Sequence, residues 1–73
     1  MHIEYDREND TAYVSLVAHI EDGAAVRQIP VDGVGADAEV FLDVDASGRL
    51  LGIEVIGAGG ALPTEALEQS SAG

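Results

Sequence analysis

Hydrophobic and polar residues alternate along several short runs of the chain. In residues 2–6, HIEYD, Ile3 and Tyr5 share one side, and residues 11–18, TAYVSLVA, alternate in the same way. A period of two is typical of half-buried β-strands, because successive strand side chains point to opposite faces. The polar residues REND at 7–10 separate the two runs as a turn. Together they predict a β-hairpin.

A second hairpin is predicted further along the chain. Residues 39–45, EVFLDVD, and residues 49–56, RLLGIEVI, are strand-like, and residues 46–48 form the short turn between them. Residues 24–31, AAVRQIPV, make a weaker strand candidate. Pro30 has no amide donor, so this strand is expected to lie at a sheet edge or to end there.

The C-terminal part of the sequence predicts one short helix. Pro63 is suited to the first turn of a helix, and Glu65 lies near the positive end of its dipole. We therefore expect a helix over residues 63–68 and a flexible tail over residues 69–73. The glycine-rich residues 57–60 are expected to be a linker.

These elements predict a mainly β, small α+β domain over residues 1–68. It is an antiparallel sheet of two hairpins plus an edge strand, with one short C-terminal helix. The residues expected to share its apolar face are Ile3, Tyr5, Val14, Leu16, Val40, Leu42, Val44, Leu51, Ile53 and Val55. One helical turn cannot cover such a face, and a chain of 73 residues without cysteine has no disulfides to stabilise it. We therefore expect a homo-oligomer, in the simplest case a dimer.

The charge of the chain is strongly negative. Fourteen Asp and Glu residues face three Arg and Lys residues, which gives a formal charge of -11. Such a polyanion repels nucleic acids and anionic membranes and favours a basic partner protein or a cation. The sequence contains no apolar run of about 20 residues, and its acidic start lacks the apolar core of a signal peptide. The expected location is the cytoplasm.

Residues 43–54, DVDASGRLLGIE, resemble a calcium-binding EF-hand loop. Asp43, Asp45 and Glu54 are the candidate ligands, and any Ca²⁺ bound there would be held weakly. However, an EF-hand loop lies between helices, whereas both flanks here are strand-like. Asp45 is instead suited to accept hydrogen bonds from its own turn, and Gly48 to supply its positive φ, followed by a bulge. We therefore expect a turn and no cofactor.

The same residues are the candidates for catalysis. If the chain is an enzyme, Glu54 or Asp43 would be the base and Tyr13 an orienting donor, in a pocket formed with a second subunit. A carboxylate base needs a raised pKa, which burial would supply. The alternative is that these carboxylates belong to a solvated sheet and turn.

The two predicted hairpins resemble a bacterial and archaeal family, the domain of unknown function 2283. The stretches that carry the resemblance are YDREND-TAYVSL at 5–16, FLDVDASGRLLGIEVI at 41–56, and the ALP that follows. The resemblance as a whole covers about 50 of the 73 residues. The matching positions are Tyr5, Asp6, Asp10, Ala12, Tyr13, Leu16, Asp43, Asp45, Gly48, Arg49, Gly52, Ile53 and Glu54. The middle segment and residues 57–60 depart from the family pattern. The resemblance implies a small β-rich fold and an antitoxin-like role beside small toxin-like proteins.

The sequence therefore favours a small acidic, non-catalytic module that self-associates and binds a basic partner. The alternative is a small enzyme of isomerase or cyclase type, which uses carboxylates and tyrosines between two subunits. A concave pocket lined by Tyr13, Asp43 and Glu54 would distinguish the two.

Overall fold

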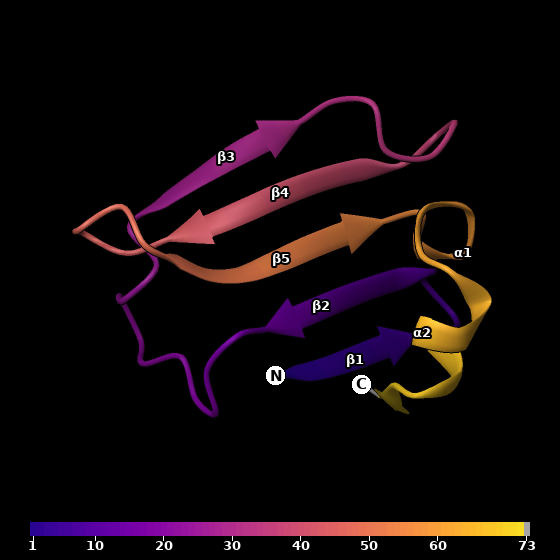
Figure 1. Ribbon diagram of the computed structural model, residues 1–73, viewed down its shortest axis with the longest axis horizontal. Helices are drawn as coiled ribbons and strands as arrows, with labels where there is room; N and C mark the ends of the chain where they lie inside the picture. Colours follow the sequence, from indigo (N-terminus) through magenta and orange to yellow (C-terminus); the bar gives the residue numbers. More distant parts are fainter. Residues whose placement is uncertain (73) are drawn as a thin grey trace.

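One twisted sheet forms most of the computed structural model, which describes residues 1–72 (Figure 1). Its five antiparallel strands are β1 (His2–Asp6), β2 (Thr11–Ser15), β3 (Arg27–Val31), β4 (Glu39–Val44) and β5 (Leu50–Ile56). Their order is β3-β4-β5-β2-β1, so the pairing of β2 with β5 joins the two hairpins. The predicted sheet of two hairpins plus an edge strand is confirmed.

The edge strand β3 pairs with β4, and Pro30 lies opposite Phe41. The strand begins at Arg27, whereas the apolar pattern predicted a strand from residue 24. Val26 remains outside the strand and is 59% exposed. The edge position suits Pro30, because a missing amide donor is tolerated where no second neighbour needs it.

The first hairpin is closed by the side chain of Asp6. Its Oδ1 accepts hydrogen bonds from the backbone amides of Glu8 and Asn9, and its Oδ2 accepts a bond of 2.7 Å from the Asn9 side chain. These bonds, that from the Asn9 side chain foremost, lower the pKa of Asp6 because they stabilise its charged form. The acidic turn is thus a structural part of the hairpin.

Two short helices follow the sheet, α1 (Ala58–Ala61) and α2 (Thr64–Glu68). The helix predicted over residues 63–68 corresponds to α2. The prediction that residues 57–60 form a linker was wrong, because residues 58–60 belong to α1 and Gly57 is its N-cap. This helical turn is possible because Gly57 adopts a φ of 80° and the amides that follow it find acceptors in the first hairpin.

The segment expected to be a flexible tail, residues 69–73, contains a further strand. β6 (Ser71–Ala72) pairs in parallel with β1, opposite Glu4 and Tyr5. Composition gives no signal for this pairing, since two residues of strand hold no hydrophobic pattern. Gly73, the last residue of the expected tail, lies outside the described residues.

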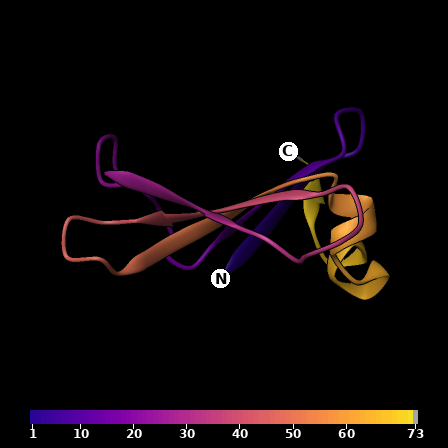
Figure 2. The same cartoon turned by 90° about the horizontal axis from the view of Figure 1, so that it is seen from above.

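The apolar face of the sheet carries two rows of side chains that run across all five antiparallel strands. The first, which we call the covered row, consists of Val31, Val40, Val55, Ala12 and Tyr5. The second, which we call the open row, consists of Ile29, Leu42, Ile53, Val14 and Ile3. Both helices lie at one end of the sheet and on one side of it (Figure 2).

The covered row meets α1 and α2 in the hydrophobic core. Ala58 of α1 is fully buried, and Leu62 and Leu67 pack against the same cluster. Val55, at the centre of the covered row, is 2% exposed. Within residues 1–72, neither helix has the length or the apolar character needed to cross a membrane.

Candidate functional site

The opposite face of the sheet, which we call the polar face, brings the candidate site residues together. Its central row, in the order of the strands, consists of Pro30, Phe41, Glu54, Tyr13 and Glu4. The next row consists of Gln28, Asp43, Gly52, Ser15 and His2. The register therefore places Tyr13 beside Glu54 and one row away from Asp43. Their roles in catalysis stay a prediction.

Tyr13 reaches from β2 across β5 to β4. Its hydroxyl donates a hydrogen bond of 2.6 Å to Oδ2 of Asp43. The ring passes directly over Gly52, where an added Cβ would lie 2.6 Å from the ring Cζ and 2.8 Å from Cε2. Glycine is thus needed at this position because the tyrosine ring occupies the space that a side chain would take.

Burial and this hydrogen bond favour the protonated form of Tyr13. Burial foremost, then the hydrogen bond to Asp43 and the negative charges of Asp43 and Glu54, raise the pKa of Tyr13 to about 12. Tyr13 is therefore a neutral proton donor at physiological pH, and its donor is already engaged by Asp43, which is only 8% exposed. The pair acts as a cross-strand tie, and Glu54 remains the more accessible carboxylate beside it.

The hollow beside these residues is small. Glu4, Asp6, Thr11, Tyr13 and Glu54 are among the residues that line a depression of about 160 Å³. Sites for small molecules usually measure about 300–1,000 Å³. The depression is therefore suited to one side chain of a partner more than to a whole substrate.

The calcium-like segment 43–54 forms the turn between β4 and β5. Oδ1 of Asp45 accepts hydrogen bonds of 2.9 Å from the amides of Ser47 and Arg49. Gly48 has a φ of 80° and its amide donates to the carbonyl of Asp45, while the amide of Asp45 donates to the carbonyl of Arg49, so that Gly48 forms the bulge of the turn. A separate register shift lies between Asp43 and Val44, before the turn. The predicted turn with a bulge is confirmed. Among residues 1–72, no three His, Cys, Asp or Glu side chains are grouped so as to hold a metal ion.

Asp10 connects the first hairpin to α1, a role that the sequence did not reveal. Its backbone carbonyl accepts hydrogen bonds of 2.9 Å from the amides of Gly57 and Ala58, and its Oδ1 accepts one of 2.8 Å from Gly59. The Tyr5 hydroxyl donates to the same Oδ1 at 2.9 Å, and this bond is the main reason why the pKa of Tyr5 is raised. The amides of Gly57, Ala58 and Gly59 are therefore satisfied by the backbone carbonyl and the carboxylate of Asp10, so they are not free to bind a phosphate.

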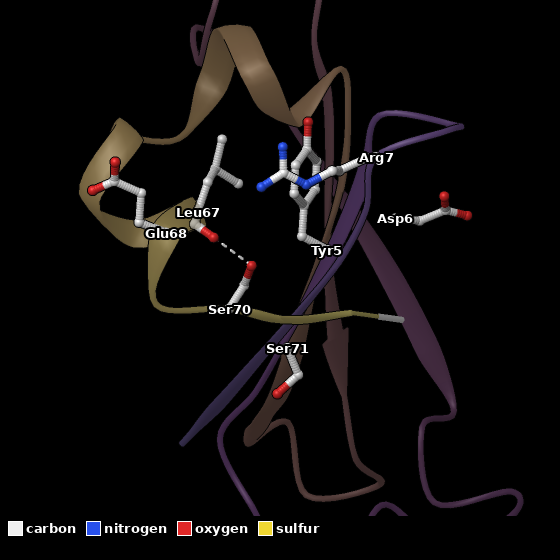
Figure 3. Close-up of a pocket in the computed structure, with 7 residues that line it drawn as sticks. All are labelled: Tyr5, Asp6, Arg7, Leu67, Glu68, Ser70 and Ser71. Atoms are coloured by element: carbon white, nitrogen blue, oxygen red, sulfur yellow. Dashed lines mark hydrogen bonds between the residues drawn. The ribbon is translucent and has the colours of Figure 1, made fainter.

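A second hollow, of about 330 Å³, lies between the first hairpin and the C-terminal segment (Figure 3). Tyr5 and Arg7 come from the hairpin side, whereas Leu67 and Ser70 come from α2 and the residues after it. The Ser70 hydroxyl donates to the carbonyl of Leu67. This hollow was missed because it depends on the unexpected position of the C-terminal segment against β1.

Comparison with known proteins gives one match. A family model described as "Protein of unknown function (DUF2283)" matches residues 2–58, which include all five antiparallel strands. No curated protein and no solved structure matches the chain. The match confirms the family resemblance that the two hairpins carry.

Proposed function

The chain belongs to the DUF2283 family, and from its geometry we propose that it is a non-catalytic interaction module whose polar face binds a basic protein. The observation that carries this proposal is the alternation of carboxylates and aromatic rings along the central row of the polar face. In that row Glu54 lies between Phe41 and Tyr13, and Tyr13 is followed by Glu4.

Such a row has the chemistry that recognises a cationic side chain. A carboxylate supplies a charge-assisted hydrogen bond to a guanidinium or ammonium group, and an adjacent ring face attracts the same cation. The strand residues of this face include no Arg or Lys that would compete for these groups. The charge of -11 adds long-range attraction for a basic partner.

The family resemblance gives this proposal a specific form, in which the basic partner is a small toxin-like protein and the chain acts as its antitoxin. The enzyme alternative receives less support from the geometry. The Tyr13 donor is already bonded to Asp43, and the adjacent depression is only about 160 Å³.

A titration with a short arginine-rich peptide tests the proposal. We expect saturable binding, with amide NMR shifts concentrated at Tyr13, Phe41 and Glu54. Glu54→Gln removes one charge from the centre of the row. It should weaken binding about 10-fold, because one partly exposed charge pair between Glu54 and the peptide is lost. The matched control is Glu65→Gln, which removes the same charge from the exposed surface of α2.

The comparison of these two variants decides between a site and general attraction. Equal weakening by Glu54→Gln and Glu65→Gln, or NMR shifts spread over all acidic residues, would refute a specific polar-face site. Added salt should weaken binding of the peptide in every variant, since the attraction between opposite charges is screened.

A further inference from the structure

The open row lacks a cover in the single chain. Every residue of this row is partly exposed, whereas Val40, Val55 and Ala12 at the centre of the covered row are buried. The open row crosses five strands, which is a strip of about 19 Å at the usual spacing between strands. Leu16 continues this apolar surface toward the end of the sheet away from the helices and is 38% exposed.

Four of the five other exposed large apolar residues lie at that same end, and the fifth, Ile56, ends β5 beside α1 on the polar face. Met1 precedes β1, Val17 follows β2, Val26 precedes β3 and Leu50 begins β5, so all four are at the sheet end opposite α1 and α2. Their exposed fractions range from 38% for Leu50 to 88% for Met1. Exposed large apolar side chains gathered at one end of a sheet are typical of an interaction site.

The total exposed area agrees with a missing partner. A compact monomer of 7.5 kDa is expected to expose about 4,250 Å². The chain exposes 4,939 Å², an excess of about 700 Å² over that expectation. A stable interface of standard size buries about 800 Å² on each partner. The excess is thus about the area that one partner would remove.

The charge distribution indicates which partner fits. The carboxylates of the five antiparallel strands all lie on the polar face, and they are Glu4, Asp6, Glu39, Asp43 and Glu54. The open row contains only aliphatic side chains, and the charged strand residue on its face is Arg27 at the start of β3, so this face offers nothing to a basic protein. A second copy of the chain offers the same uncharged strip, and two identical patches satisfy a two-fold symmetric interface.

We propose that two copies of this chain pack face to face through their open rows, as a two-layer β-sandwich with the helices at its ends and both polar faces outward. Aligned sheets of this kind lie about 10 Å apart and interdigitate their inner side chains. This inference concerns the face opposite to the proposed partner site and does not depend on binding of a basic protein.

Sedimentation over a range of protein concentrations and two matched variants test this arrangement. The native chain should sediment at twice its 7.5 kDa. Ile29→Glu places a carboxylate in the open row and should raise the dimer Kd by at least about 100-fold. Gln28→Glu adds the same charge to the adjacent residue of the same edge strand, on the polar face, and should leave the dimer intact.

The effect of added salt on dimerisation of the unmodified chain is a second, independent test. Because both copies carry a charge of -11, added salt should tighten the dimer by screening their repulsion, the opposite of its effect on a basic partner. A native chain that stays at 7.5 kDa at millimolar concentration in high salt would overturn the proposal, whatever the variants do. Equal dissociation by Gln28→Glu and Ile29→Glu would show that the open row is not the interface.

Discussion

Replacing Gly52 by alanine tests how the polar face is built. The new Cβ would lie 2.6 Å from Cζ of Tyr13, so the ring must move away from Asp43. Displacement of a packed side chain costs about 1–3 kcal/mol, and loss of a hydrogen bond to a buried charged group costs about 1.5–3 kcal/mol. Glycine gives up more chain entropy on folding than alanine, which returns about 0.5–1 kcal/mol. The net destabilisation is about 1.5–5.5 kcal/mol, a large part of the stability of so small a domain.

A double-mutant cycle identifies the cause of this loss. The assay is urea unfolding followed by far-UV circular dichroism, with all variants at one protein concentration because association contributes to stability. In a Tyr13→Ala background, Gly52→Ala should be neutral or stabilising, since the space above β5 is then free. A coupling energy of at least about 2 kcal/mol is expected. If Gly52→Ala costs the same in both backgrounds, the ring of Tyr13 is not what requires glycine here.

Two further predictions concern Asp10 and the tyrosines. Asp10→Ala removes the acceptor of the Gly59 amide and should lower the free energy of unfolding by about 1–3 kcal/mol. Asp10→Asn keeps an acceptor and tolerates the φ of 53°, so it should lower the stability less in thermal unfolding. The raised pKa of Tyr13 means that its contribution to stability is complete below pH 10 and is lost as the pH rises through about 12. The phenolate absorbance of the native chain should therefore rise at a higher pH than that of free tyrosine. Tyr13→Phe should reduce the loss of stability at alkaline pH. Titration of both tyrosines near pH 10 would contradict this assignment.

The sequence predicted those parts of the fold that depend on local patterns. Alternation located both hairpins, and Asp45 and Gly48 identified their own turn, because turn chemistry acts over a few residues. The pairing of Ser71–Ala72 with β1 was missed, since a contact between the chain ends leaves no periodic signal. The helix at Ala58–Ala61 was missed because its amides are satisfied by Asp10, almost 50 residues earlier.

The sequence identifies candidate residues for the site but not their geometry. The chemistry of Tyr13, Asp43 and Glu54 makes them candidates, and the register places them on one face. Tyr13 bonds to Asp43 because Gly52 leaves room for its ring to cross β5. No spacing rule connects residues on three strands, so this arrangement required the structure.

The pairing of β2 with β5 has a consequence for the folding pathway. Each hairpin closes a short loop and can form within microseconds. The pairing of β2 with β5, which we call the seam between the hairpins, must instead bring together segments separated by the whole of β3 and β4. We expect this docking step to limit the folding rate, because the chain loses the entropy of loop closure before the non-local contacts can stabilise it. Lengthening the segment between β2 and β3 should slow folding only slightly, since doubling a flexible loop costs only about 0.6 kcal/mol. Variation in this middle segment is therefore compatible with both hairpins and with the seam that joins them.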